Sequence, residues 1–313
     1  MSSTLRPPGQ QARASTAPNR LSGDGAAAVA SAVLRTARPK QWLKNVLVFA
    51  APAAGGVLFL PVVAASASWT AVVFTVASAS TYFINDARDV EADRRHPIKV
   101  LRPVAAGRLS PRTAYAIGTA LGLLAPALAL PLGWATVGVV CLYLGITVAY
   151  SLWLKNQAVV DLLAVAAGFL LRAVAGGVAT GVALSNWFLL VVLFGSLFLV
   201  TAKRSAEERR GGSSARVTLD QYPAAWLQQV LTMSMAGVVL TYATWALQYV
   251  GADVGSLPLA LSVVPFLALM LRYSLLVARG EGEAPEELLT SDRFMVTAAV
   301  IWVALVGGAL YLA

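Results

Sequence analysis

The side chains best suited to chemistry lie in one charged stretch, residues 85–103 (NDARDVEADRRHPIKVLRP), which holds four carboxylates and five Lys or Arg. The stretch begins with the pattern N-D-x-x-D-x-x-x-D. If the chain is helical there, Asn85, Asp89 and Asp93 are spaced by four residues and share one face, with Asp86 close by. Two carboxylates about 6 Å apart repel each other by roughly 3 kcal/mol at an effective dielectric near 20. A divalent cation between them is the simplest way to remove that repulsion.

The ligand types indicate which cation this would be. Asp86, Asp89 and Asp93 are the candidate catalytic and metal-binding residues, and they offer oxygen atoms without clustered His or Cys. Oxygen ligands favour Mg2+, then Mn2+, and hardly Zn2+. Because Mg2+ usually shares its coordination with substrate phosphates, the pattern predicts a phosphorylated substrate, most simply a diphosphate. The alternative is a solvated, salt-bridged loop in which Arg88, Arg94 and Arg95 neutralise the acids.

Basic side chains come to the same membrane boundary from several segments, including RPKQWLKN (38–45), YSLWLKN (150–156) and TAKRSAEERR (201–210). Lys and Arg are ready phosphate ligands, although anionic lipid headgroups would attract them too. The predicted substrate-binding residues are Asn85 and ten basic residues: Lys40, Lys44, Arg94, Arg95, Lys99, Arg102, Lys155, Arg172, Lys203 and Arg204. Glu207 is a further candidate metal ligand. His96 is alone in the chain, and we interpret it as a hydrogen-bonding loop residue rather than a catalytic base.

Arg172 differs from the other basic residues because it is expected at membrane depth. It lies within DLLAVAAGFLLRAVAGG, 11 residues after Asp161, so three helical turns place both residues on one face. An unpaired charge at that depth costs about 2.5–3.5 kcal/mol on the insertion scale. Arg172 should therefore face a polar cavity. Its role is open at this point between a structural pair with a neighbouring helix and a contact with substrate.

The elements that must position these residues are transmembrane helices. The chain has 313 residues, 58% hydrophobic and 12% charged, with a mean hydropathy of +0.70, values typical of polytopic membrane proteins. Apolar runs of about 20 residues recur along it, long enough to cross a hydrocarbon layer of roughly 30 Å as helices. Nine are predicted, near 42–62, 68–88, 113–132, 134–153, 159–181, 186–202, 224–250, 257–279 and 293–312. The expected fold is an all-α membrane protein with nine transmembrane helices around a cytoplasm-facing cavity.

Two features set the limits of this domain. The first 34 residues lack an apolar run and a secretory signal, and we expect a disordered cytoplasmic tail there, followed by one catalytic domain over 35–313. The single cysteine, Cys141, lies in the fourth apolar run, which excludes an intrachain disulfide and a thiolate metal cluster. It is interpreted as a small buried hydrophobic residue.

The net charge of +9 does not indicate nucleic-acid binding, because the basic residues follow membrane topology. Apart from Arg172, they lie in the N-terminal region, in the links after the second, fourth, sixth and eighth runs, or at bordering helix ends. The alternate links have none. This asymmetry predicts that the N-terminus and the charged site face the cytoplasm across the plasma membrane, with the C-terminus outside.

The motifs together resemble the UbiA superfamily of intramembrane prenyltransferases. The resemblance rests on NDARDVEAD in the second run, RPKQWLKN before the first, and AGRLSP at 106–111, and it covers the chain from about residue 35 onward. It implies nine helices and a cytoplasmic cavity where aspartates hold magnesium and a diphosphate. Carried to this sequence, those aspartates are Asp86, Asp89 and Asp93.

The sequence differs from the lipoquinone-type members of this superfamily in one motif, and this difference indicates which branch it resembles. Those members carry a second aspartate-rich motif after the sixth helix, where this chain has KRSAEERR with Lys203, Arg204 and Glu207. With the other motifs, this substitution is similar to the decaprenyl-phosphate phosphoribosyltransferase branch. That branch transfers 5-phosphoribose from phosphoribosyl diphosphate to a polyprenyl phosphate, toward arabinogalactan and lipoarabinomannan of the cell wall.

Three functions follow as hypotheses. The first is magnesium-dependent phosphoribosyl transfer to a polyprenyl phosphate, with phosphoribosyl diphosphate, the lipid and the bilayer as partners and a homo-oligomeric state left open. The second is transfer of an isoprenoid from its diphosphate to an aromatic acceptor, which predicts a second carboxylate cluster. The third is a transporter, which predicts a site near the midplane of the bilayer and inverted repeats.

Overall fold

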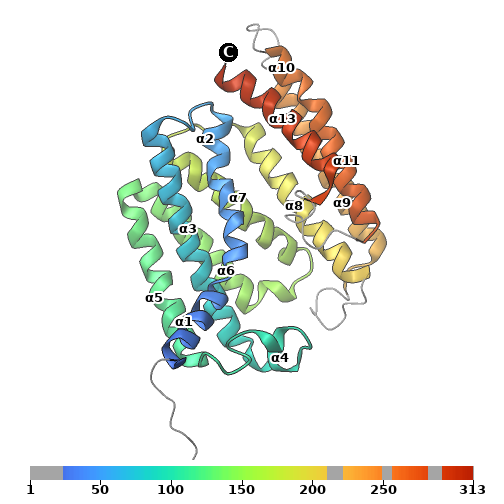
Figure 1. Cartoon of the computed structure of the whole chain (residues 1–313). Helices are drawn as coiled ribbons and strands as arrows, with labels where there is room; N and C mark the ends of the chain where they lie inside the picture. Colours follow the sequence, from blue (N-terminus) through green and yellow to red (C-terminus); the bar gives the residue numbers. More distant parts are fainter. Residues whose placement is uncertain (1–23, 210–220, 249–255, 281–290, 313) are drawn as a thin grey trace, which may run out of the picture.

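The computed structural model describes residues 24–209, 221–248, 256–280 and 291–312, and every regular element in these ranges is helical. Eight helices are long and apolar enough to cross a membrane: Pro61–Arg88 (α3), Pro111–Leu132 (α5 and η3), Trp134–Leu152 (α6), Val160–Thr180 (α7), Asn186–Arg209 (α8), Ala224–Gln248 (α9), Leu257–Ala278 (α10 and α11) and Arg293–Tyr311 (α13). Within the two composite spans, α5 is Pro111–Ala129, η3 is Leu130–Leu132, α10 is Ser256–Leu261 and α11 is Val263–Ala278. Figure 1 shows them side by side in a bundle. The chain is an integral membrane protein with the predicted all-α fold.

The first predicted span, near 42–62, differs from a single α-helix. A 3-10 helix, η1 (Pro39–Phe49), leads into a short α-helix, α2 (Ala50–Ala54), and the chain then turns at Gly56, which has a φ of 68°. Because a 3-10 helix rises about 2.0 Å per residue and an α-helix about 1.5 Å, η1 and α2 together extend about 30 Å. That length matches the hydrocarbon layer. Nine crossing segments are therefore consistent with the structure. The first segment ends at Ala54 rather than near residue 62, because two glycines follow it before α3 begins at Pro61.

The predicted disordered tail is wrong in its second part. Residues 24–37 form helix α1 (Asp24–Ala37), with the sequence DGAAAVASAVLRTA. Alanine has the highest helix propensity, and Ala32 packs with Phe83 and Ala87 of α3, so local preference and packing agree. Residues 1–23 lie outside the described residues, and the prediction for them stays untested.

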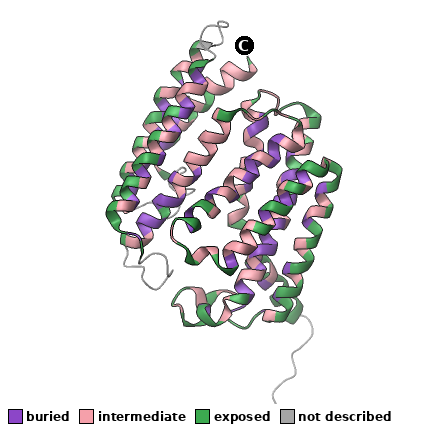
Figure 2. Cartoon of the chain, turned by 180° about the vertical axis from the view of Figure 1, so that it is seen from behind, coloured by how far each residue is buried: buried purple, intermediate pink, exposed green. Residues whose placement is uncertain are grey.

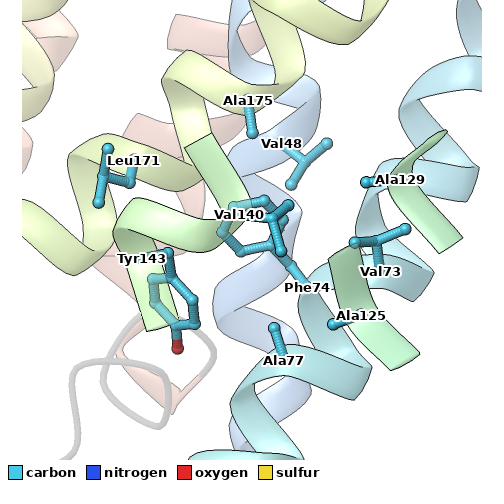
Figure 3. Close-up of a cluster of buried hydrophobic side chains, with 10 residues drawn as sticks. All are labelled: Val48, Val73, Phe74, Ala77, Ala125, Ala129, Val140, Tyr143, Leu171 and Ala175. Atoms are coloured by element: carbon cyan, nitrogen blue, oxygen red, sulfur yellow. The ribbon is translucent and has the colours of Figure 1, made fainter. Parts of the chain in front are cut away.

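The two largest of five hydrophobic clusters among the described residues join most of the long helices. The first joins η1, α3, α5, α6 and α7 and is drawn in Figure 3; the ring centres of its two aromatic residues, Phe74 and Tyr143, are 5.1 Å apart. The second joins α8, α9, α11 and α13 around Phe198 and Tyr273. Figure 2 shows buried residues facing the interior and exposed residues along the outer helix faces. Those outer faces carry large apolar side chains such as Leu123 and Val264, as expected for surfaces in contact with lipid. The prediction that Cys141 is buried is wrong, because it lies exposed on α6, where a small apolar side chain can face lipid.

The candidate site lies at one end of this bundle. Short helices α4 (Val90–Arg95), η2 (Lys99–Leu101) and η4 (Leu154–Asn156) follow α3 and α6. Figure 1 shows α1 and α4 at the same end, with the C-terminal end of α13 at the opposite end. The charged stretch identified in the sequence therefore gathers at one boundary of the bundle.

Glycines allow two close approaches between neighbouring helices. A Cβ atom added to Gly118 of α5 would lie 2.8 Å from the Ile84 side chain, and the Ser80 hydroxyl donates to the Gly118 carbonyl at 2.7 Å. A Cβ atom added to Gly176 of α7 would lie 1.8 Å from the Val48 carbonyl oxygen. The first approach sets α5 against α3, and the second sets η1 against α7.

Candidate active site

Two buried carboxylates and two arginines form the centre of the site. Asp86, in the last turn of α3, is 2% exposed, and Asp93, in α4, is 3% exposed. The Arg102 Nη1 donates to both, at 3.2 Å to Asp86 and 2.7 Å to Asp93. Arg38 donates to the same oxygen of Asp86 at 2.5 Å and stacks 4.7 Å above the ring of Tyr82. The acids are therefore buried and charge-compensated rather than solvated.

Asp89 belongs to a separate pair. It lies between the end of α3 and the start of α4, and Lys155 Nζ is 3.0 and 2.7 Å from its two carboxylate oxygens. The predicted single helix is broken at Asp89, but its hydrogen bonds continue: the Asp89 N–H donates to Asn85 and the Asp93 N–H donates to Asp89. The one-turn spacing of these three residues is therefore kept.

The residues fit a hard divalent cation in type. Within the described ranges, no three His, Cys, Asp or Glu side chains converge closely enough to hold an ion by themselves. Asp86 and Asp93 nevertheless meet at one cationic atom of Arg102, and they supply oxygen atoms alone. Such a donor set suits an ion that takes most of its ligands from substrate phosphates and water. The metal-binding role of the three aspartates stays a prediction.

The alternative, neutralisation of the acids by Arg88, Arg94 and Arg95, agrees with the structure only for Glu91, because the three aspartates pair with Arg38, Arg102 and Lys155 instead. Arg88 donates to the carbonyls of Ser151 and Leu152 at the end of α6. Arg94 pairs with Glu91 at 2.8 Å on the surface. Arg88 thus donates to carbonyl groups at the C-terminal end of α6, where backbone carbonyls have no partner within the helix.

The remaining basic candidates divide by exposure. Lys40, Arg95 and Lys203 are exposed, while Lys44 and Lys99 are partly buried. Lys44 Nζ lies 5.7 Å from the ring centre of Phe169 on α7. These five residues keep their predicted role as phosphate ligands, which nothing in their contacts tests.

His96 has the predicted loop role. Its Nδ1 accepts from the backbone N–H groups of Ile98 and Lys99, at 3.2 and 3.3 Å. Partial burial, with Lys99 next in effect, lowers the pKa of His96 below its usual value. The neutral ring therefore acts as an acceptor that holds the turn after α4.

Arg204 and Glu207 take part in a buried network instead of standing open to a ligand. Arg204 is 2% exposed, and it donates to Asp161 at 3.4 Å and to Glu207 at 3.1 Å. The Tyr222 hydroxyl donates to Asp161 and accepts from the Val159 N–H. Burial and the hydrogen bond to Asp161 raise the pKa of the Tyr222 phenol, so it stays protonated and donates. The predicted ligand roles of Arg204 and Glu207 stay untested.

Arg172 lies deep in α7 and is 5% exposed, as its position in the sequence predicted. It donates to Asn45 Oδ1, the Gly168 carbonyl and the Tyr143 hydroxyl, at 2.9, 2.6 and 2.9 Å. Asp161, which shares its helix face by spacing, bonds to Arg204 and Tyr222.

Sequence reasoning missed several partners of the site. Arg38 lies in the RPKQWLKN motif, but its contact with Asp86 depends on a left-handed backbone, with φ at 54° and ψ at 66°. Tyr82 could have been noted because it precedes Asp86 by four residues on α3. Asn45 and Tyr143 carried no signal, since single polar residues in apolar runs are common.

The fold and the charged cluster define the class: an integral membrane protein built from apolar helices, with acids and bases gathered where α3 meets α4. The family model described as the UbiA prenyltransferase family matches residues 45–298, and the chain belongs to that family. A relative from Mycobacterium tuberculosis named decaprenyl-phosphate phosphoribosyltransferase is 43% identical over 88% of this chain and 93% of its own. A relative of the same name from Mycolicibacterium smegmatis is 41% identical over 90% and 93%. A solved structure, a UbiA homolog from Archaeoglobus fulgidus bound to GPP and Mg2+, shares the fold with a TM-score of 0.68 at 18% identity, covering 90% of this chain and all of that one.

Proposed function

We propose that this protein transfers 5-phosphoribose from phosphoribosyl diphosphate to a polyprenyl phosphate and releases diphosphate. The observation that carries the proposal is the near full-length similarity to relatives named decaprenyl-phosphate phosphoribosyltransferase. The charge of the site supports it. Glu207, the acid nearest in sequence to Lys203 and Arg204 on α8, already accepts from Arg204, and with only Glu208 beside it the described α8 holds no second aspartate-rich cluster. A prenyltransferase of the lipoquinone type would need that cluster for its diphosphate.

The proposed reaction is a displacement at C1 of the ribose. A phosphate oxygen of the lipid attacks C1, the bond from C1 to the diphosphate oxygen breaks, and the configuration inverts through an oxocarbenium-like transition state. Because the lipid phosphate is already anionic at neutral pH, no strong general base is required. The side chains chiefly position the reactants and neutralise charge.

The basic residues address the repulsion between two anionic substrates. Arg38, Arg102 and Lys155 already compensate the three aspartates, and the exposed Lys40 and Lys203 add positive charge for incoming phosphates. Lysine and arginine bind phosphate as a point charge and as a planar fork, respectively. The site thus supplies both kinds of phosphate ligand.

A divalent metal is part of the proposal, with Mg2+ first and Mn2+ second. Asp86, Asp89 and Asp93 would hold it, and it would stabilise the negative charge of the departing diphosphate. The magnesium-bound archaeal homolog of the same fold supports the choice.

The proposed orientation places the site and the N-terminus in the cytoplasm and the C-terminus outside. The basic links support this orientation by the positive-inside rule, and α1 and the end of α13 lie at opposite ends of the bundle (Figure 1). The polyprenyl chain would then lie along apolar helix faces within the bilayer.

A label-transfer assay tests the function. Membranes containing the protein are incubated with ribose-labelled phosphoribosyl diphosphate and polyprenyl phosphate, with and without a chelator. We expect label in the organic phase only when free divalent metal is present, with Mg2+ restoring it. Label that stays in the aqueous phase under all conditions would refute the proposal. Membranes without the protein are the control.

A further inference from the structure

Arg172 is a buried cation at a depth where charges are costly. It lies 12 residues after the start of α7 at Val160, which corresponds to about 18 Å at 1.5 Å per residue. Its three hydrogen bonds go to an amide oxygen, a backbone carbonyl and a phenol, all neutral acceptors. Among the residues that the structure describes, no carboxylate forms an ion pair with it.

The neighbours of Arg172 offset part of its charge and leave hydrogen-bonding capacity. The rings of Tyr143, Phe74 and Phe169 lie 4.8, 5.9 and 6.0 Å from the guanidinium carbon, and aromatic faces attract cations. A guanidinium carries five N–H donors, and Arg172 uses one on each of its three nitrogens. One N–H on each terminal nitrogen thus remains for a further acceptor, and two N–H groups of a guanidinium can bind a phosphate in bidentate fashion.

A second cation lies on the same aromatic ring. Lys44 Nζ is 5.7 Å from the ring centre of Phe169, which also borders Arg172. Two positive side chains from η1 and α7 therefore flank one ring in the interior. Their position favours an anion over a neutral ligand.

This region and the carboxylate cluster share helix α3. Tyr82 lies one helical turn before Asp86 on α3, and Arg38 stacks on its ring. Phe74, whose ring centre lies 5.9 Å from the Arg172 guanidinium carbon, is on the same helix. Helix α3 thus carries both an aromatic neighbour of Arg172 and the first carboxylate of the candidate site.

We propose that Arg172 binds a phosphate group of a substrate, at a subsite deeper than the three aspartates. The inference rests on the proposed function, which must accommodate a diphosphate, a ribose 5-phosphate and a lipid phosphate. A phosphate ester supplies the missing negative charge and accepts from the two remaining N–H groups. The ribose 5-phosphate and the lipid phosphate share this chemistry, and the experiment distinguishes them.

The test uses Asn45→Asp as its main variant. This change keeps the size of the side chain but places a carboxylate on Arg172 Nε, so the protein provides its own counter-ion and no longer needs the phosphate. We expect a rise of about tenfold to a hundredfold in one KM, the size of a lost charge-assisted hydrogen bond. Arg172→Gln should raise the same KM. Arg272→Gln, which removes an arginine from the ion pair between α11 and Asp292, should leave both KM values unchanged.

The two substrates are titrated separately. A rise confined to phosphoribosyl diphosphate assigns the subsite to the ribose 5-phosphate, and a rise confined to polyprenyl phosphate assigns it to the lipid. Unchanged KM values for both, together with lower thermal stability in Arg172→Gln, would overturn the proposal and leave Arg172 as a link between helices. If Arg172→Gln does not fold, Arg172→Lys replaces it, since it keeps the charge but loses the fork.

A binding experiment distinguishes the phosphate subsite at Arg172 from the proposed transferase activity. The purified protein is heated with ribose 5-phosphate or with decyl phosphate, a short lipid phosphate, and the shift in Tm is measured. We expect one of them to stabilise the wild type and not Asn45→Asp. A stabilised wild type without transferase activity would refute the proposed function and retain the subsite. Equal shifts in Tm for the wild type and Asn45→Asp would refute the phosphate subsite at Arg172 but not the proposed transferase activity.

Discussion

Gly176→Ala should displace η1 from α7. The added methyl group would lie 1.8 Å from the Val48 carbonyl oxygen, so the backbone of η1 must retreat by about 1.6 Å to reach an ordinary contact of 3.4 Å. A backbone atom cannot rotate away as a side chain can. We expect a loss of about 3 kcal/mol in the free energy of unfolding, the upper end of the usual overpacking range. The same shift stretches the 2.9 Å hydrogen bond from Arg172 to Asn45.

Thermal denaturation of the purified protein measures this effect. A loss of about 3 kcal/mol corresponds to a fall in Tm of about 5–10 °C. Gly145→Ala is the matched control, because its added methyl group meets no atom within 4 Å and alanine favours the helix by about 1 kcal/mol. We expect Gly145→Ala to keep or raise the Tm. Equal Tm values for the two variants would refute the packing of η1 on α7.

Three further predictions concern the site and its supports. Asp89→Asn should reduce metal-dependent turnover by at least about a hundredfold, while Glu91→Gln, at an exposed position, should not; similar rates in the label-transfer assay would contradict the role of Asp89. Tyr222→Phe should lower the free energy of unfolding by about 2 kcal/mol, because buried Asp161 loses a hydrogen bond; an unchanged melting curve would count against it. The folded pKa of His96 is lowered, so its stabilising contribution is full above its usual value of 6.5 and is lost as the pH falls through the folded pKa. The difference in Tm between wild type and His96→Ala should therefore shrink on acidification, and a constant difference would contradict this.

The hydropathy of the sequence was enough to place the long helices. Eight predicted spans match the structure closely at most ends because lipid forces apolar runs of this length into helices. The predicted bounds of the first span were wrong. Because η1 rises about 2.0 Å per residue, fewer residues are needed to cross the hydrocarbon layer. The α1 helix was missed because its pattern is weakly apolar and its packing on α3 is tertiary.

The sequence predicted which acidic residues form the candidate site better than it predicted which basic side chains pair with them. The spacing predicted Asp86, Asp89 and Asp93 close together, and Asp86 and Asp93 do meet at Arg102. Asp89 pairs instead with Lys155, 66 residues away in sequence, and no local pattern specifies that pair. Lys203 and Arg204 are adjacent and chemically similar, yet one is exposed and the other is buried. Successive helical residues point about 100° apart, so only the position of a buried acid on α7 decides which of the two turns inward.

The central claim is that a phosphate oxygen of the lipid becomes the bridge to C1 of the ribose. The most direct test is mass spectrometry of the products made by the purified protein from polyprenyl phosphate labelled with oxygen-18 in its phosphate and unlabelled phosphoribosyl diphosphate. We expect a phosphoribosylated lipid that keeps all of the label, and released diphosphate that carries none. Labelled diphosphate, or a lipid without phosphoribose, would contradict the claim.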